Sequence, residues 1–279
     1  MLQQTRVAAV LEHYREFLVR FPRMEKLASS REASVLAAWS GLGYYRRARM
    51  LHQGARQVVR ELAGTIPCTA AGLRQLPGIG RYTAAAIASI AFGERVAVVD
   101  GNVERVVQRL TGKRLAGEDI WRAATDLLAP KRPGDFNQAM MELGATVCLP
   151  RAPLCMTCPV LELCATRGEL DGGEKLKPQK KREIHFALDC RDEAVFLVRR
   201  PRDAPLMPGM WELPQLAGSL NGNPVLSLRH SITVTDYTVR VWRAPAGVPG
   251  KWVKFKGLPR VALTGLTRKI LRSASCTLG

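Results

Sequence analysis

Four cysteines crowded into one short segment constrain this chain more than any other feature of its sequence. The segment "CLPRAPLCMTCPVLELC" places Cys148, Cys155, Cys158 and Cys164 with six, two and five residues between successive thiols, and it contains three prolines. Thiols this close can fold as a small loop around one metal centre. Structural zinc sites usually use two short Cys-x2-Cys pairs, whereas this segment has a single short pair. The spacing therefore favours a [4Fe-4S] cluster, with zinc and four unrelated buried thiols as the alternatives.

The chain is also strongly basic. It carries 42 Lys and Arg against 24 Asp and Glu, a formal charge of +18 over 279 residues, and the excess is spread along the sequence. Such a charge indicates a polyanionic partner, with a merely soluble basic surface as the alternative. The longest small-apolar run, "TAAAIASIAFG", is too short to cross a bilayer, and no signal peptide is visible. The sequence thus predicts a cytoplasmic protein, without a membrane partner, whose cysteines are reduced.

The periodicity of apolar residues divides the chain into three parts. Residues 1–167 follow a helical period throughout, which predicts a mainly α region. Residues 168–182 are rich in Gly, Lys and Pro and predict an exposed linker. Residues 183–279 change to an alternating pattern and end on a helical one, which predicts a smaller α+β domain.

A two-glycine turn between two helical patterns is the first candidate binding element. In "LRQLPGIGRYTAAAIASIAFG" the first helix is expected to stop at Pro77, and Gly78 and Gly80 precede the second helix. Glycines here allow backbone conformations that bring amide groups near the second helix's N-terminus toward an anion. We expect this anion to be a DNA phosphate, with a plain helix–helix turn as the alternative.

An acidic residue follows in a second turn. In "VVDGNVERVVQRL" Asp100 stands between an apolar run and a new helix. Asp is a common helix N-cap, so Asp100 or Asn102 could simply cap this helix. The alternative is a reactive carboxylate held at the helix start.

The order of hairpin, Asp100 and cysteine segment resembles that of the helix-hairpin-helix-Gly-Pro-Asp superfamily of DNA glycosylases. The resemblance implies a glycosylase domain over residues 1–167 with a [4Fe-4S] loop at 148–164, and a second domain from 183. It also implies that Asp100 is the ionised catalytic carboxylate, with Asn102 and Tyr82 as supporting neighbours. Bifunctional members of the superfamily carry a lysine at the position of Tyr82, two residues after the second hairpin glycine. A phenol cannot form a Schiff base, so the chain resembles a monofunctional glycosylase.

Two further segments, "WSGLGYYRRARMLH" and "MLQQT", resemble adenine DNA glycosylases. The resemblance makes Tyr44 and Gln4 residues that intercalate beside the lesion, and Leu42 and Thr5 residues that approach 8-oxoguanine. A helix break with buried aromatics is the alternative for "GLGYY". In the same way, four positions match residues that line the pocket of the flipped adenine: Leu2, Val7, Gln138 and Met141.

The tail from about 183, including "PLMPGMWELPQLAG", resembles the Nudix-like domain with which this family senses 8-oxoguanine. It lacks the glutamate-rich segment that holds Mg²⁺ in Nudix hydrolases, which argues against pyrophosphate hydrolysis. Where the family has a Phe-Ser-His loop, this chain has Ile232, Thr233 and Val234. Thr233 retains a hydroxyl for lesion contact.

Taken together, the resemblance implies a monomeric, nucleoid-associated adenine DNA glycosylase of base excision repair. An enzyme of this kind would hydrolyse the N-glycosidic bond of adenine opposite 8-oxoguanine or guanine in double-stranded DNA. The family's general-acid glutamate stands two residues before the methionine of the "MLQQT" segment, upstream of Met1, and Glu12 or Glu16 is not expected to replace it. We therefore expect weak DNA binding and very slow excision by the chain as written. A DNA-binding iron–sulfur protein without catalysis and a bifunctional lyase of the endonuclease III type are the alternatives.

Overall fold

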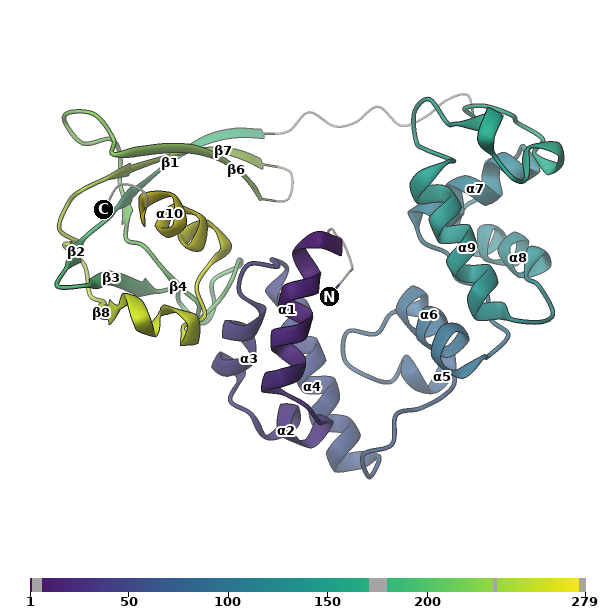
Figure 1. Ribbon diagram of the computed structural model, residues 1–279, viewed down its shortest axis with the longest axis horizontal. Coiled ribbons are helices and arrows are strands. Elements are labelled where there is room, and N and C mark those ends of the chain that lie inside the picture. Colours follow the sequence, from purple (N-terminus) through teal and green to yellow (C-terminus); the bar gives the residue numbers. More distant parts are fainter. Residues whose placement is uncertain (2–6, 171–179, 233–234, 276–279) are drawn as a thin grey trace. The chain divides into compact units, whose positions relative to one another are not determined.

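The fold was analysed in a computed structural model, which describes residues 1, 7–170, 180–232 and 235–275 (Figure 1). The helices are α1 (Val7–Arg20), α2 (Met24–Ser29), α3 (Glu32–Trp39), α4 (Tyr45–Glu61), α5 (Ala70–Leu73), α6 (Arg81–Phe92), α7 (Gly101–Thr111), α8 (Gly117–Leu127), α9 (Pro133–Thr146) and α10 (Gly265–Ser275). Short 3-10 turns are η1 (Cys155–Thr157), η2 (Leu161–Leu163) and η3 (Phe255–Arg260). The strands are β1 (Lys180–Ala187), β2 (Cys190–Arg191), β3 (Ala194–Arg199), β4 (Trp211–Glu212), β5 (Gln215–Leu216), β6 (Leu226–Ile232), β7 (Thr235–Trp242) and β8 (Lys251–Lys254).

The chain folds into two compact units. The first unit contains residues 1–59 and 177–279, and the second contains residues 60–176. The N-terminal helices therefore share a unit with the C-terminal strands, although more than a hundred residues separate them along the chain. The three-part division by sequence pattern, with parts 1–167, 168–182 and 183–279, stays a prediction beside these two units.

In the first unit, α1 buries one side of its apolar stripe. Val10, Phe17 and Phe21 are at most 7% exposed and pack with Trp39 in a core formed by the N-terminal helices. Several large apolar side chains of α1, among them Val7 at 60%, are solvent-exposed within this unit. Pro22 lies two residues after the end of the helix, where its ring cannot continue the hydrogen-bond pattern.

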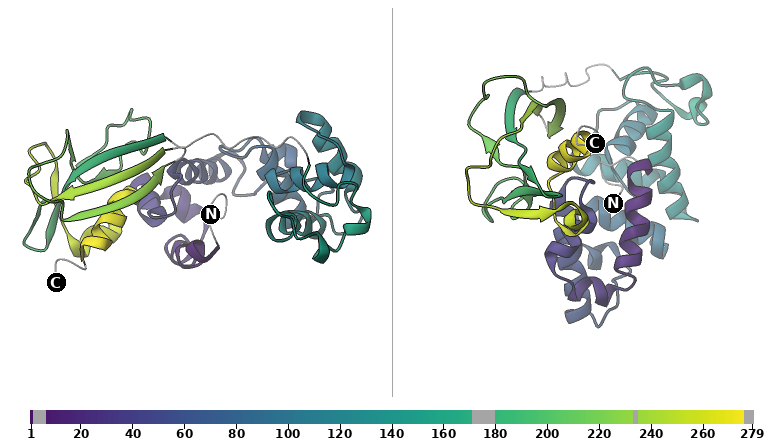
Figure 2. Two further views of the ribbon diagram at one scale, coloured as in Figure 1. Left: turned by 90° about the horizontal axis from the view of Figure 1, so that it is seen from above. Right: turned by 60° about the vertical axis from the view of Figure 1, so that its left-hand side comes forward.

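The C-terminal part of this unit is built on two four-stranded sheets. One has the order β5-β1-β7-β6, with β1 and β7 parallel and the outer pairs antiparallel. In the other, β3 pairs with β2, β4 and β8, all antiparallel. Helix α10 covers the first sheet and buries Ile270 and Leu266 against it (Figure 2). The alternating and final helical patterns read from the sequence are thus confirmed as strands and helix.

The N-terminal helices share a core with residues of the C-terminal segment that lie outside its strands. Met210, which is fully buried, and Ala262 pack among the side chains of α1, α3 and α4. Arg49 adds a polar contact, because its guanidinium donates to the carbonyl of Pro208 at 2.5 Å. The C-terminal segment is therefore a structural partner of the first four helices.

The second unit is helical. Valines of α7, including Val103, Val106 and Val107, pack against α8 and α9 in its core. Helices α6 and α7 both end in a glycine with positive φ, Gly93 at 73° and Gly112 at 65°, a conformation that costs glycine little. No described helix in either unit is long and apolar enough to cross a membrane.

Candidate functional site

The second unit holds Asp100 at the start of α7. Its Oδ1 accepts hydrogen bonds from the backbone amides of Asn102 at 2.9 Å and Val103 at 2.8 Å. Asp100 is thus the N-cap of α7, as one of the two interpretations expects. Within the described part of the chain Oδ2 accepts no hydrogen bond, so one carboxylate oxygen fixes the side chain and the other is available. Capping orients the carboxylate and is compatible with a chemical role.

Tyr82 lies near enough to this carboxylate to feel its charge, and it contacts Met141. The hydroxyl of Tyr82 donates to Sδ of Met141 at 3.7 Å, which joins α6 to α9. Burial, and secondarily the negative charge of Asp100, raise the pKa of Tyr82 above its usual value. The phenol therefore stays protonated at neutral pH, as a neutral donor next to the carboxylate.

Asn102 is held by Arg105. The guanidinium of Arg105 donates to Oδ1 of Asn102 at 2.9 Å, to the Gly144 carbonyl at 2.6 Å and to the Cys148 carbonyl at 2.8 Å. Burial is the main cause that lowers the pKa of Arg105, and the charges of Cys148 and Asp100 oppose it. One side chain thus connects the start of α7, the end of α9 and the first cysteine.

Helices α7 and α9 are in close contact at Gly144. A Cβ added there would lie 2.7 Å from the Cβ of Asn102 and 2.9 Å from its carbonyl oxygen. Because the obstacles include backbone atoms, only glycine fits without a shift of α7.

We expect Gly144→Ala to lower the free energy of unfolding by about 1–3 kcal/mol through overpacking. Gly101→Ala is the matched control, because nothing lies within 4 Å of its added Cβ and the site is helical. Urea denaturation of both variants measures the difference. A Gly144→Ala protein as stable as Gly101→Ala would contradict the close packing described.

The cysteine segment wraps around Arg109, which is 4% exposed. Its guanidinium donates to Sγ of Cys148 at 3.3 Å and to the carbonyls of Leu149 at 2.7 Å and Pro150 at 3.1 Å. The Arg109 carbonyl lies 3.4 Å from Sγ of Cys164. The first and last cysteines of the segment are therefore tied to the same residue.

The four thiols themselves are free and half-buried. Among the described residues no three or more His, Cys, Asp or Glu side chains form a group arranged to hold a metal ion. The donor set still fits a thiolate-ligated centre in its chemistry, since all four thiols lie in one segment and two of them touch Arg109.

The predicted hairpin is present, although its first helix, α5, ends at Leu73 rather than at Pro77. Gly78 has a φ of 75°, in the left-handed region, and Gly80 is the N-cap of α6 with extended backbone. Arg81 forms an ion pair with Glu118 of α8 and lies 4.0 Å from the centre of the Trp121 ring. The turn leaves the first amides of α6 without intrahelical partners, as an anion site requires.

In the first unit, loop 41–44 carries two predicted lesion contacts. Leu42 is 5% exposed and belongs to the core of the N-terminal helices, whereas Tyr44 is 51% exposed. Tyr44 has a φ of 46°, which is unusual for a residue with a Cβ. Cζ of Arg47 lies 5.3 Å from the centre of the Tyr44 ring, in a cation–π contact. The loop thus presents the Tyr44 ring outward, as intercalation would need.

The other predicted residues are distributed as follows. Gln138 is exposed on α9 and its amide donates back to the Gly134 carbonyl at 3.3 Å. Val7 is exposed on α1. Leu2, Gln4, Thr5 and Thr233 lie outside the described residues.

Sequence reasoning missed Arg105 and Arg109. Both lie on α7, four residues apart, and Arg109 falls among the buried valines of that helix. A charged residue inside an apolar stripe was the available signal, since buried arginines require partners.

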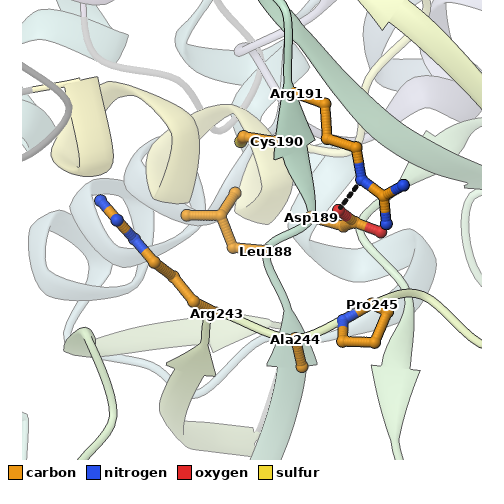
Figure 3. A pocket seen from close by; sticks show the side chains of 7 residues that line it. All are labelled: Leu188, Asp189, Cys190, Arg191, Arg243, Ala244 and Pro245. Atoms are coloured by element: carbon orange, nitrogen blue, oxygen red, sulfur yellow. Dashed lines mark hydrogen bonds and ion pairs between the residues drawn. The ribbon is translucent and has the colours of Figure 1, made fainter.

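A separate cavity of about 340 Å³ lies in the C-terminal part of the first unit (Figure 3). Residues 188–191 and 243–245 line it, and Asp189 accepts from Arg191 at 3.3 Å along one wall. None of the residues predicted for catalysis or DNA contact lines this cavity. It is not the candidate site.

Comparison with known proteins identifies the family. Residues 1–128 match the HhH-GPD superfamily of base excision DNA repair proteins. A solved thermostable thymine-DNA glycosylase superposes with a TM-score of 0.56 at 30% identity, covering 60% of this chain and 79% of that chain. The chain therefore belongs to the HhH-GPD superfamily, with a predominantly helical fold and an additional sheet region.

Within the superfamily, two similar curated relatives are adenine DNA glycosylases. The human enzyme is 52% identical over 178 residues, which are 61% of this chain and 33% of that protein. The Arabidopsis thaliana enzyme is 40% identical over 260 residues, which are 77% of this chain and 41% of that protein. The chain thus spans about a third to two fifths of the length of these two relatives.

Proposed function

We propose that the chain carries the excision activity of an adenine DNA glycosylase, which hydrolyses the N-glycosidic bond of adenine in duplex DNA. The observation that carries the proposal is the carboxylate of Asp100, which two amides fix through Oδ1 while no described residue donates to Oδ2. Breaking the glycosidic bond leaves positive charge on the sugar, and a carboxylate held in place stabilises that charge. The identities with adenine DNA glycosylases support adenine as the base removed.

The supporting residues keep this carboxylate in place. Asn102 supplies one amide to Asp100, and Arg105 fixes the side chain of Asn102. Tyr82 is a neutral phenol next to Asp100, without the amine that a lyase uses to attack C1′. We propose hydrolysis without strand cleavage. Protonation of the departing base is a separate step, and no described residue is assigned to it.

The proposed substrate is double-stranded DNA with adenine opposite 8-oxoguanine or guanine. The charge of +18 favours binding to a polyanion, and the turn at Gly78 and Gly80 is suited to a backbone phosphate. Tyr44, exposed and supported by Arg47, is the proposed wedge beside the lesion. A monomer in the cytoplasm, associated with the nucleoid, remains part of this proposal.

We further propose that Cys148, Cys155, Cys158 and Cys164 hold one [4Fe-4S] cluster. The anchoring of Cys148 and Cys164 to Arg109 supports a single folded loop. When bound, the cluster would supply four metal–thiolate bonds that close the loop. The Nudix-like character of the C-terminal strands, with Thr233 as a lesion contact, is likewise proposed on the resemblance alone.

The proposal is tested by single-turnover excision on a labelled duplex with adenine opposite 8-oxoguanine. We expect free adenine and an intact abasic strand, and no excision from an ordinary A:T duplex. Cleavage of the strand together with borohydride trapping would favour the bifunctional lyase instead. Binding to the duplex without any adenine release would favour the DNA-binding protein without catalysis.

A further inference from the structure

Loop 41–44 holds one residue with a Cβ, Tyr44, in a backbone conformation that favours glycine. Gly41, Gly43 and Tyr44 all have positive φ, at 108°, 68° and 46°. A non-glycine residue in this region costs free energy, so the surroundings must hold the loop. Part of the support comes from neighbouring helices, because Trp39 Nε1 donates to the Gly43 carbonyl at 3.2 Å and Arg47 lies over the Tyr44 ring.

The other support comes from the C-terminal segment. Ser40, just before the loop, donates from its hydroxyl to the carbonyl of Leu263 at 2.9 Å. Tyr45, just after the loop, donates to the same carbonyl at 3.1 Å, and its hydroxyl also accepts from the Gly41 amide at 3.4 Å. Ser40 is 1% exposed and Tyr45 is 4% exposed. The two residues that flank the loop thus meet at one buried oxygen.

This oxygen is itself well fixed. Leu263 is 3% exposed and forms a parallel bridge with Trp211. The Trp211 amide donates to the Ala262 carbonyl, and the Thr264 amide donates to the Trp211 carbonyl, both at 2.9 Å. A carbonyl oxygen has two lone pairs, and the two hydroxyls use both. Water therefore has no place at this acceptor.

We propose that Ser40 and Tyr45 are positioning residues, which transmit the placement of the C-terminal segment through the Leu263 carbonyl to the Tyr44 wedge. The inference rests on the proposed function, because it assigns Tyr44 to lesion contact. The C-terminal segment then contributes to discrimination between 8-oxoguanine and guanine through the geometry of loop 41–44. This contribution is separate from any direct contact that the segment makes with DNA.

The test uses Ser40→Ala, Tyr45→Phe and the double variant, each in the full chain. Hydrogen exchange of the amides of residues 41–44 should become faster in both single variants and fastest in the double variant. Ser40→Thr keeps the hydroxyl and should retain protection. Tyr14→Phe, the same chemical change at a tyrosine that is 52% exposed, is the matched control and should change nothing. Unchanged protection in the double variant would show that Ser40 and Tyr45 do not hold loop 41–44.

Binding measurements test the specificity role. We expect the double variant to lose about tenfold in its preference for A:8-oxoguanine over A:G duplex, which corresponds to about 1.4 kcal/mol. Its affinity for A:T duplex should stay within about twofold of the unmodified chain. In a Tyr44→Ala background the double substitution should have no further effect on preference, because the wedge is already absent.

The outcomes separate the inference from the proposed function. An equal loss of preference with and without Tyr44 would overturn the positioning role. A chain that shows no preference before any substitution would overturn the proposed lesion specificity, and hydrogen exchange alone would then decide whether Ser40 and Tyr45 hold the loop.

Discussion

Asp100→Asn is expected to yield a folded protein that releases adenine about 10²- to 10³-fold more slowly than the unmodified chain. The substitution removes the negative charge that stabilises the cationic sugar. It keeps the N-cap, because an asparagine Oδ1 accepts the same two amides that now bind Asp100. Single-turnover excision on A:8-oxoguanine duplex measures the rate relative to the unmodified chain.

Two controls separate lost charge from lost structure. Asp119→Asn makes the same change in an exposed ion pair with Arg122 on α8 and should leave excision unaffected. Asp100→Ser retains capping without an amide or a charge and should be as slow as Asp100→Asn. An Asp100→Asn protein within about threefold of the unmodified rate would remove Asp100 from the proposed mechanism.

Much of this site follows from local sequence. Asp100 before the valine-rich pattern of α7 predicts both an N-cap and a carboxylate at a helix start, and the structure shows the cap. The glycine turn at Gly78 and Gly80 was predictable for the same reason, because its conformation is set by the residues themselves. The strands after residue 180 were predictable from the alternation of apolar and polar residues in this part of the chain.

Contacts between distant segments could not be predicted in this way. Tyr45 and Leu263 are 218 residues apart, and nothing in either local pattern specifies the hydrogen bond between them. Met210 looks like any apolar residue, yet it packs among the N-terminal helices. Arg109 was missed because a periodicity argument counts apolar residues and passes over a buried cation whose partners come from another segment.

Arg109 nevertheless carries the second large effect. We expect Arg109→Met to lose most of the proposed iron–sulfur cluster and to lower the free energy of unfolding by about 3 kcal/mol. The methionine fills similar space but donates no hydrogen bond, so the carbonyls of Leu149 and Pro150 lose their buried donor. A hydrogen bond to a charged group contributes about 1.5–3 kcal/mol to stability. The thiol of Cys148 loses its contact as well, while the hydrogen bond from Arg105 to the Cys148 carbonyl remains.

Iron and sulfide analysis, the visible absorption of the cluster and urea denaturation measure these effects on anaerobically purified protein. Arg109→Lys keeps the charge but lacks the guanidinium fork that reaches both carbonyls, so it should retain an intermediate amount of iron. Arg122→Met, at an exposed arginine of α8, is the matched control and should bind iron like the unmodified chain. Full iron content in Arg109→Met would show that the cysteines fold around the metal without help from α7. Zinc in place of iron and sulfide in the unmodified chain would reject the proposed cluster. Urea denaturation would then decide whether Arg109 holds the cysteine segment.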